Sequence, residues 1–451
     1  MTDLIQFERL GLFNAKVPRY TSYPTAPHFD AGVNAEQFTR WLNAIPKGDA
    51  ISLYVHIPFC RRLCWFCACR TQGVKTDTPL ETYVRRLETE IDMVFRNLPQ
   101  GVTLSQLHWG GGTPTILGPR LITRLAKKIT DRFPFSPNYT FSVEIDPNEI
   151  DKQRIAALAA AGMNRASLGI QDFDDKIQSA IGRPQGFNET KYAFELLRDY
   201  GVGSINADLV YGLPHQTKHR LTQTVQKLTS LSPDRIALYG YAHVPWMARR
   251  QKLIDSDALP SSFERLELFN CASDLLIWDG YRAIGIDHFA LSHDEMSNAQ
   301  KNRTLKRNFQ GYSVDPSNVL IGLGASSISH FPNGYAQNAS ATSQYAAAID
   351  QHEFATIRGH VFNHDDRVRA KIINSLMCNF DVQTADIINN FAINRDALYS
   401  EFVEINRKFE YLLVVNERGL FVPPKVRPLT RMIAREFDAY ELSRAGHSAA
   451  I

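Results

Sequence analysis

Six short apolar, β-branched runs alternate with amphipathic segments in the first half of the chain, and this alternation limits the possible folds more than any other feature. The segments between the runs place apolar residues at helical spacing, at 81–97, 120–132, 153–161, 189–200 and 221–231. Such an alternation predicts an α/β fold with a parallel sheet, either open and doubly wound or curled into a barrel. Six βα units are fewer than the eight that close a barrel. The runs occupy residues 51–57, 104–109, 139–145, 165–170, 204–211 and 235–241.

The pattern changes after about residue 250. Residues 261–278 predict a helix, and 281–289 and 319–323 predict strands. From about residue 360 the pattern becomes helical, most clearly at 366–380 and 430–442. We therefore expect an N-terminal extension at 1–45, a large α/β domain at 46–355, and a smaller, mostly helical C-terminal domain at 356–451.

Composition and charge exclude several classes of protein. With 44% hydrophobic and 22% charged residues, a chain of 451 residues can bury a large core, unlike a disordered or fibrous chain. No stretch approaches the ~18 consecutive apolar residues of a membrane span, and the first residues lack the basic and then apolar order of a secretory signal. We therefore expect a cytoplasmic protein. A net charge of +3 is too small to indicate nucleic-acid binding by itself.

Four of the six cysteines, Cys60, Cys64, Cys67 and Cys69, lie in one short stretch directly after the first run. A disulfide framework needs an oxidising compartment and cysteines spread along a small chain. A structural zinc site usually takes four ligands as two separated pairs, and no second Cys/His pair is nearby. Thiolates in one loop suit an iron–sulfur cluster equally well, and three ligands on four irons leave one iron open. A Cys64/Cys67 redox pair is a third interpretation, although no thioredoxin-like segment surrounds it.

Glycine or polar residues end several of the predicted strands. Residues 110–112 are three successive glycines after the second run, which let a ligand approach the backbone closely and expose N–H groups. Glu144 lies near the end of the third run, Gln171 directly follows the fourth, and Asp208 lies in the fifth. Because the carboxyl ends of parallel strands meet at one edge of a sheet, these residues predict a shared site.

The spacing Cys-x3-Cys-x2-Cys after the first strand of such a domain resembles the radical S-adenosylmethionine (SAM) superfamily, in which the open iron chelates SAM. Nearly the whole chain resembles one family within it, the oxygen-independent coproporphyrinogen III oxidases (dehydrogenases) of tetrapyrrole biosynthesis. Cys69 supports this resemblance, since these oxidases carry Cys-x-Cys at the end of the loop and the related heme chaperones have an aromatic residue there. The other matching segments are PRYTSYPT at 18–25, YAH at 241–243, DHFA at 287–290, RNFQGY at 307–312 and YAQN at 335–338.

The resemblance implies an incomplete (β/α)6 radical SAM barrel at 46–355, with residues 1–45 as a lid over the substrate. It makes Cys60, Cys64 and Cys67 the ligands of a 4Fe-4S cluster, and it leaves Cys69 as a non-ligand with a role in catalysis. It also implies two bound SAM molecules. Arg19 and Arg307, which lie in the family-like segments, are candidates to hold substrate propionates. The expected SAM contacts are Tyr54, Phe66, Gly111, Gly112, Thr113, Glu144, Gln171, Arg183, Asp208, Ala242 and Ile328.

The implied reaction is an oxidative decarboxylation without oxygen. One electron enters the reduced cluster, SAM splits into methionine and a 5′-deoxyadenosyl radical, and the radical takes a hydrogen from the β-carbon of a propionate. Carbon dioxide and a further electron then leave, which produces a vinyl group. Done twice, this converts coproporphyrinogen III to protoporphyrinogen IX in heme biosynthesis. The resemblance implies a low-potential electron donor such as a flavodoxin or ferredoxin, and we expect a monomer without a nucleic-acid partner.

Three alternatives remain open. A heme chaperone of the same fold would keep the three cluster cysteines without turning over the porphyrinogen. A heme-degrading radical SAM methyltransferase would convert heme to a methylated linear product. A nucleic-acid-binding protein with a structural zinc would contain zinc and no sulfide.

Overall fold

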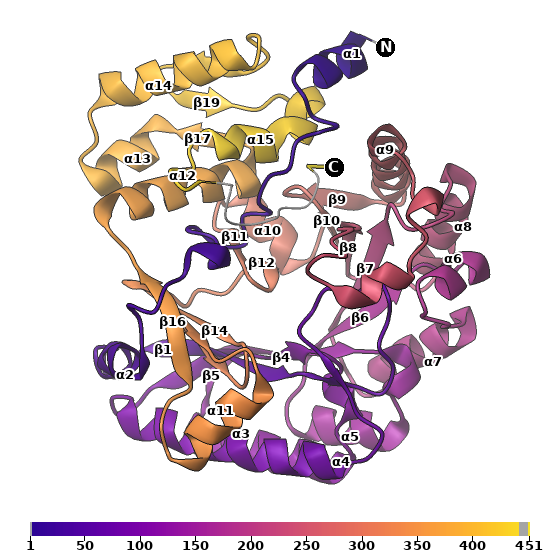
Figure 1. Ribbon diagram of the computed structural model, residues 1–451, viewed down its shortest axis with the longest axis vertical. Helices are drawn as coiled ribbons and strands as arrows, with labels where there is room; N and C mark the ends of the chain where they lie inside the picture. Colours follow the sequence, from indigo (N-terminus) through magenta and orange to yellow (C-terminus); the bar gives the residue numbers. More distant parts are fainter. Residues whose placement is uncertain (1, 442–449) are drawn as a thin grey trace.

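The computed structural model describes residues 2–441 and 450–451. A mixed sheet of twelve strands runs through the molecule, and helices cover its outer face (Figure 1). Six of the strands correspond to the six predicted runs, and they are parallel neighbours in chain order. The predicted α/β architecture is confirmed for this part of the chain. These strands are β1 (Ala50–Ile57), β4 (Thr103–Gly111), β5 (Phe135–Ile145), β6 (Arg165–Gln171), β7 (Ser204–Tyr211) and β8 (Arg235–Gly240).

Helices in the connections between these strands supply the outer half of the main core. In β1, the alternate residues Ile51, Leu53 and Val55 are fully buried, and they share one core with Leu87 and Ile91 of the first connecting helix. Because side chains alternate along a strand, the apolar ones point to the face of the sheet that the helices cover, and the other face is left for polar side chains. The helices are α3 (Thr78–Asn97), α4 (Pro119–Arg132), α5 (Lys152–Ala160), α6 (Asp175–Ala180), α7 (Phe187–Asp199) and α8 (Lys218–Thr229), and α9 (Ser262–Trp278) follows β8.

The sheet is wider than the six predicted parallel strands. On one side, β13 (Leu320–Leu323) lies parallel to β1 and continues into an antiparallel meander of β14 (Ile328–Phe331), β15 (Gly334–Asn338) and β16 (Thr356–Val361). On the other side, β10 (His288–Leu291) and β9 (Tyr281–Ile284) form an antiparallel hairpin next to β8. The sheet is therefore mixed. β16 pairs with β15 although it lies beyond residue 355, where we expected the large domain to end.

A second core lies under the C-terminal helices and includes α1 (Thr2–Arg9) at the other end of the chain. The predicted helix at 366–380 is confirmed as α12 (His364–Asn379). The helix predicted at 430–442 is too long, because α15 (Thr430–Arg435) ends earlier. After it the chain turns, and the side chain of Asp438 accepts a hydrogen bond from the N–H of Tyr440. Residue 442 lies outside the described residues. The other C-terminal elements are α13 (Thr384–Phe391), α14 (Arg395–Lys408), β17 (Asp381–Gln383), β18 (Val414–Asn416) and β19 (Gly419–Phe421).

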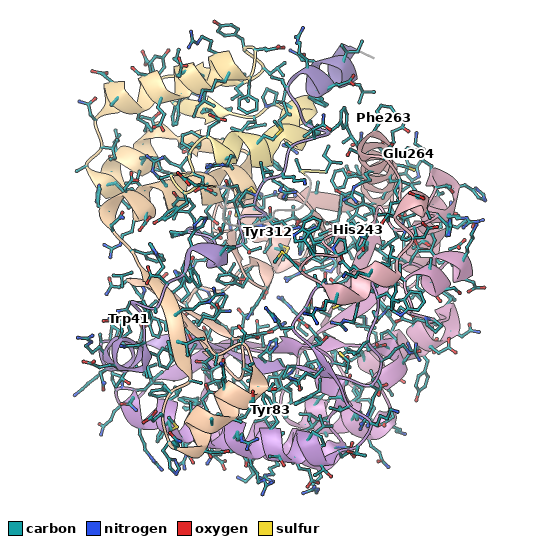
Figure 2. The ribbon with its side chains drawn as sticks, in the orientation of Figure 1. Trp41, Tyr83, His243, Phe263, Glu264 and Tyr312 are labelled. Atoms are coloured by element: carbon teal, nitrogen blue, oxygen red, sulfur yellow. The ribbon has the colours of Figure 1, made fainter. Side chains whose placement is uncertain are left out.

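Tyr83 and Tyr312 form hydrogen bonds between elements that lie far apart in the sequence (Figure 2). Tyr83 of α3 donates a hydrogen bond to the carbonyl of His56 at 2.9 Å, and it accepts the N–H of Ala325 at 2.9 Å. Tyr312 donates to the carbonyl of Met377 in α12 and thus ties the C-terminal helices to the sheet side of the molecule. The remaining short elements are α2 (Ala35–Asn43), α10 (Glu295–Lys301), α11 (Thr342–Asp350), β2 (Phe59–Cys60), β3 (Gln72–Gly73), β11 (Lys306–Asn308) and β12 (Gly311–Ser313).

Candidate active site

A cavity of about 840 Å³ lies against the polar inner face of the parallel strands. The strand residues Glu144, Gln171 and Asp208 all line it, as does Ala242 just beyond β8. Phe66, Cys67 and Cys69 reach it from the cysteine loop. The structure therefore brings seven of the residues singled out from the sequence to one place, together with Arg19 and Arg307.

The other expected SAM contacts, Tyr54, Gly111, Gly112, Thr113, Arg183 and Ile328, do not line this cavity. The ring of Tyr54 stacks on that of His108, with centroids 5.6 Å apart, and His108 lines the cavity. Thr113 and Arg183 contact cysteines of the loop. Ile328 lies on β14, which is separated from β1 by β13, and it is not among the residues that line this cavity.

The cysteine loop is held at its base and on both sides. β2 and β3 pair at its two ends, where Phe59 lies opposite Gln72. On one side, the N–H of Trp65 donates to the carbonyl of Ile181 at 2.9 Å. On the other side, the Gln251 side chain donates to the carbonyl of Phe66 at 2.7 Å. The loop thus has a fixed position at the end of β1.

Each of the three predicted cluster ligands has a defined environment. Thr113 Oγ1 donates to the sulfur of Cys60 at 3.5 Å, and Arg183 Nη1 donates to that of Cys64 at 3.3 Å. Burial raises the pKa of Cys60 to about 11. A hydrogen bond from the thiol of Cys69 lowers the pKa of Cys67 to about 6. Cys69 is therefore a direct neighbour of the candidate ligand Cys67.

The donor set suits an iron–sulfur cluster better than a single metal ion. Among the described residues, no three His, Cys, Asp or Glu side chains lie close enough together to hold one ion. A four-iron cluster spreads its thiolates further apart than a single ion does, and it needs only three of them when one iron stays open. Cys60, Cys64 and Cys67 meet that requirement from a single loop.

The glycines at the end of β4 allow close contacts within the chain. A Cβ atom on Gly110 would lie 2.6 Å from Glu144 Oε1, and one on Gly111 would lie 2.5 Å from the His56 ring. Gly111 also has a φ of 112°, which favours glycine. The N–H groups of Gly111 and Gly112 donate to Glu144 at 3.0 Å and to the carbonyl of Ile57 at 2.9 Å. The expectation that these N–H groups are exposed is therefore wrong, because the chain itself uses them.

Glu144 and Asp208 have carboxyl groups in contrasting surroundings. Burial alone would raise the pKa of Glu144, but His108 Nε2 at 3.2 Å and the N–H of Gly111 stabilise the carboxylate and lower that pKa. For Asp208, burial and the nearby charge of Glu144 raise the pKa to about 6. Its neutral hydrogen-bond partners, Asn206 Nδ2 at 2.8 Å and Ser167 Oγ at 3.2 Å, offset this only in part. One carboxyl group is thus held ionised, and the other titrates close to neutral pH.

Gln171 and Arg183 lie next to each other at the end of β6. Gln171 has a φ of 70°, a left-handed conformation that is uncommon for a residue with a side chain, and such strain is frequent at functional sites. Arg183 donates to the carbonyl of Gly169 at 2.8 Å and forms an ion pair with Asp146 at 3.2 Å. Its charge is therefore already balanced by a carboxylate of the chain.

Comparisons with known proteins cover the whole chain. Residues 54–228 match the radical SAM superfamily. The chain is 54% identical over 451 residues to an oxygen-independent coproporphyrinogen III oxidase of Paracoccus denitrificans (strain Pd 1222), covering 100% of both. It is 38% identical over 439 residues to the protein of that name from Escherichia coli (strain K12), covering 96% of this chain and 95% of the relative. This chain belongs to the family of oxygen-independent coproporphyrinogen III oxidases.

A solved structure from this oxidase family shows the same fold. Coproporphyrinogen III oxidase from Escherichia coli, described as a radical SAM enzyme, superposes with a TM-score of 0.90 and 35% identity over 95% of this chain and 100% of that one. The large mixed sheet described above is thus the fold of the oxidase family. The part that matches the radical SAM superfamily begins in β1 and ends in α8, so it includes the cysteine loop, Glu144 and Asp208. In the described part of this family member, no helix is long and apolar enough to cross a bilayer.

Sequence reasoning assigned no role to several polar residues of the oxidase cavity. His108 alternates with the buried Leu107 and Trp109, so the period of two in β4 already indicated an inward-facing imidazole. Tyr239 and His288 form a second group, with Tyr239 Oη 3.4 Å from His288 Nε2. His288 Nδ1 lies 2.7 Å from Asp287 Oδ1. This group comes from two strands that the sequence pattern did not pair, and its geometry could not be read from spacing.

Proposed function

We propose that this chain catalyses the oxidative decarboxylation of two propionates of coproporphyrinogen III to vinyl groups, giving protoporphyrinogen IX in heme biosynthesis without oxygen. The observation that carries the proposal is the placement of the cysteine loop at a cavity that also contains Glu144 and Asp208, in a chain 54% identical to a named oxidase of this type. The chain is a radical SAM enzyme of the oxygen-independent coproporphyrinogen III oxidase family.

Membership of the radical SAM superfamily implies a 4Fe-4S cluster and SAM. When bound, these two groups would supply a 5′-deoxyadenosyl radical that takes a hydrogen from the β-carbon of a propionate. We assign the cluster to Cys60, Cys64 and Cys67, which present three thiols from one fixed loop. Cys69 is the candidate catalytic side chain because it lines the cavity and is not one of these three.

We assign the SAM contacts to the residues in and around the cavity. Glu144 and Asp208 would accept hydrogen bonds from ribose hydroxyl or ammonium groups, and Phe66 would offer an apolar face. Gly111, Gly112, Thr113, Tyr54 and Arg183 shape the wall behind these side chains, while Gln171, Ala242 and Ile328 complete the set. The cavity of about 840 Å³ has room for a ligand of the size of SAM. We propose that the set is divided between two SAM molecules.

The chain also surrounds the reacting centre with protein. Arg19 and Thr21 of the N-terminal segment line the cavity, which supports the assignment of residues 1–45 as a lid. We assign 46–355 to the catalytic domain, whose sheet β16 (Thr356–Val361) extends, and the remainder of 356–451 to the helical domain. A covered site keeps water away from a reactive intermediate. Free thiols at the loop fit a reducing compartment such as the cytoplasm, and the reaction needs a low-potential one-electron donor such as a flavodoxin or ferredoxin. We propose that the enzyme acts as a monomer.

The test is anaerobic reconstitution followed by incubation with coproporphyrinogen III, SAM and dithionite. Formation of protoporphyrinogen IX supports the proposal. Binding of heme without vinyl formation would indicate the chaperone activity, and a methylated linear product from heme would indicate the methyltransferase. Zinc without sulfide in the purified protein would contradict the cluster assignment.

A further inference from the structure

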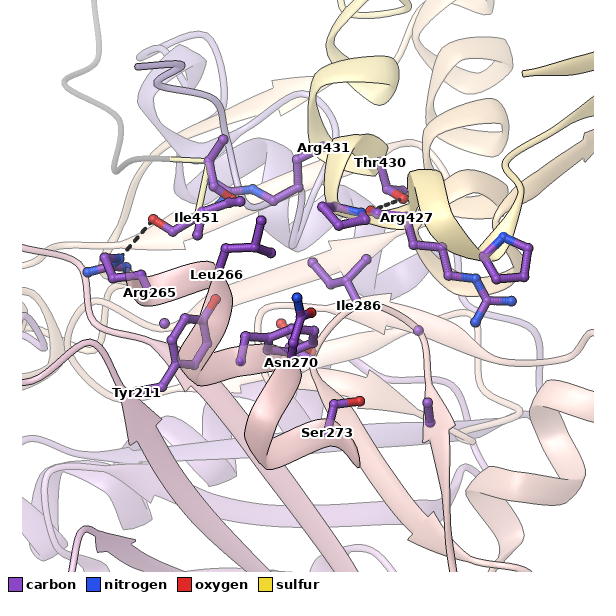
Figure 3. Close-up of a pocket in the computed structure, with 18 of the residues that line it drawn as sticks. Tyr211, Arg265, Leu266, Asn270, Ser273, Ile286, Arg427, Thr430, Arg431 and Ile451 are labelled. Atoms are coloured by element: carbon purple, nitrogen blue, oxygen red, sulfur yellow. Dashed lines mark hydrogen bonds between the residues drawn. The ribbon is translucent and has the colours of Figure 1, made fainter. Parts of the chain in front are cut away.

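A second cavity, of about 590 Å³, lies between α9 and the C-terminal segment at 424–431 (Figure 3). It shares Arg19, Gly240, His288 and Arg307 with the cavity of the candidate active site. The two cavities therefore adjoin each other.

The second cavity carries an excess of positive charge. Five arginines and one lysine line it, against two carboxylates, Glu267 and Asp287. Both carboxylates are already paired, since Glu267 accepts from Lys218 at 2.8 Å and Asp287 from Arg307 at 3.1 Å. The lining cations are Arg19, Arg265, Arg307, Lys425, Arg427 and Arg431.

Among the residues that the structure describes, 2–441 and 450–451, no Asp or Glu side chain forms an ion pair with Arg19, Arg265 or Arg427. Their contacts are with main-chain oxygens and an aromatic ring. Arg19 donates to the carbonyl of Gly240 at 2.6 Å, and Arg265 donates to the carbonyl of Tyr241 at 2.8 Å. Arg427 lies over the ring of Phe380, with its guanidinium carbon 4.2 Å from the ring centroid.

Arg19 and Arg265 are half-buried, whereas Arg427 is exposed. Partial burial lowers the pKa of both Arg265 and Arg427, and the charge of Arg19 lowers that of Arg265 further. Arg265 Nε meets a main-chain oxygen of Ile451 at 3.1 Å, so one donor that points into the cavity already has an oxygen partner there (Figure 3).

We propose that this second cavity binds the carboxylates of the substrate propionates that are not decarboxylated, with Arg265 and Arg427 as their main partners and Arg19 at the junction of the two cavities. The inference rests on the proposed function. Asn270 and Ser273 lie between Arg265 and Arg427 in the view of Figure 3 and provide neutral hydrogen-bonding groups. Leu266, Phe269 and Ile286 supply apolar surface for the macrocycle edge.

This assignment differs from the expectation based on the sequence. Arg307 was expected to hold a propionate, but both its terminal nitrogens contact Asp287, at 3.3 and 3.1 Å. Its charge is therefore balanced within the chain. No Asp or Glu side chain of the described residues pairs with Arg265 or Arg427, so their terminal nitrogens are better placed than those of Arg307 to bind a ligand carboxylate.

The test uses the reconstituted holoenzyme and coproporphyrin III, the oxidised and unreactive form of the substrate, as the probe. Its tetramethyl ester, which lacks the carboxylate charges, is the matched second probe. The variants are Arg265→Gln and Arg427→Gln, with Arg427→Lys as the rescue variant. Arg86→Gln is the control, because Arg86 pairs with Asp350 on α11, away from both cavities. Dissociation constants are measured by fluorescence titration under nitrogen.

We expect wild-type enzyme to bind the free acid more tightly than the ester. Each glutamine variant should weaken binding of the acid about tenfold or more, and should change binding of the ester less than threefold. The cluster absorbance and the basal cleavage of SAM should remain at the wild-type level, and Arg427→Lys should recover part of the affinity.

Unchanged affinity for the acid in both variants would overturn the inference, and so would equal losses for acid and ester. Tighter binding of the ester than of the free acid by the wild-type enzyme would also overturn the inference, whatever the variants show. If wild-type enzyme makes no vinyl product, the proposed function itself fails, and that outcome is distinct from these.

Discussion

Glu144 and Asp208 line the same cavity, and their surroundings shift the pKa values of the two carboxyl groups in opposite directions. His108 and the backbone of Gly111 keep Glu144 ionised, whereas burial moves the pKa of Asp208 up to about 6. An environment that separates two such values is typical of sites where neighbouring carboxyl groups have different roles.

The first prediction concerns SAM affinity. We expect Glu144→Ala and Asp208→Ala to weaken SAM binding by roughly ten- to hundredfold, the effect of losing a hydrogen bond to a charged group. The cluster should stay in place in both variants. Equilibrium dialysis of anaerobic protein measures the affinity, with Asp131→Ala on the surface of α4 as the control. Wild-type affinity in both variants would contradict the placement of SAM at the strand ends.

The second prediction concerns pH. Because the pKa of Asp208 is raised to about 6, this group loses its proton as the pH rises from 5 to 7, and only then is it a full acceptor for hydroxyl groups. SAM affinity should therefore rise over this interval in the wild type and change much less in Asp208→Asn. Dialysis at pH 5.5, 6.5 and 7.5 tests this. If SAM affinity changed equally with pH in both proteins, a group other than Asp208 would be responsible for the pH dependence.

The third prediction concerns the cysteines. Replacement of Cys60, Cys64 or Cys67 by Ser should abolish the cluster absorbance and the cleavage of SAM. Cys69→Ser should retain the cluster, as should the control Cys271→Ser, whose sulfur lies 3.6 Å from Thr222 Oγ1 and far from the loop. Loss of the cluster in Cys69→Ser would show that Cys69 is a ligand.

The fourth prediction concerns stoichiometry. If two SAM molecules serve two decarboxylations, 5′-deoxyadenosine and protoporphyrinogen IX should form in a ratio near two under anaerobic turnover. Chromatographic quantification of both products gives the ratio. Abundant deoxyadenosine without vinyl product would contradict the oxidase assignment.

The fifth prediction concerns stability. Glu90 is buried under α11, where it accepts hydrogen bonds from Tyr345 at 2.7 Å, Gly324 at 2.7 Å and Asn338 at 2.8 Å. Glu90→Ala leaves the Tyr345 hydroxyl and the Gly324 N–H unpaired, whereas Asn338 keeps the carbonyl of Gly324 and Ser327 Oγ as acceptors. Each unpaired donor costs about 1–3 kcal/mol in free energy of unfolding. The exposed Glu81→Ala serves as the control.

The decrease in free energy of unfolding caused by Glu90→Ala should also depend on pH. Burial raises the pKa of Glu90 to about 7 in the folded state, above its usual value of 4.5. The folded protein therefore holds a proton that the unfolded chain releases between these values, so the contribution of Glu90 is fully present below 4.5 and decreases as the pH rises toward 7. The difference in urea unfolding between wild type and Glu90→Ala should be larger at pH 5 than at pH 8. An equal difference would show that Glu90 does not titrate in this way.

The sequence predicts the parallel strands well because each short apolar run is separated from the next by an amphipathic helical segment. It also indicates where Glu144, Gln171 and Asp208 meet, since parallel strands end at one edge. The predicted strands at 281–289 and 319–323 are present, the first as the hairpin of β9 and β10 and the second as β13. The strands β14–β16 have four to six residues each, too few for a clear period, so the full width of the sheet was not predicted. Arg265 and Arg427 lie far apart in the sequence, and only the folding of the C-terminal segment onto α9 brings them to one cavity.

The second core has a consequence for how the molecule assembles during its synthesis. Phe7 and Leu12 belong to one core with Leu376, Phe402 and Phe437. The N-terminal segment can therefore pack only after the C-terminal part of the chain has been synthesised. Contacts over such a long sequence separation form slowly. The strand β1, which leads into the cysteine loop, pairs on one side with β4, the next long strand of the chain, and on the other side with the much later β13. A nascent chain therefore presents its four clustered thiols before β13 and the C-terminal elements have been synthesised.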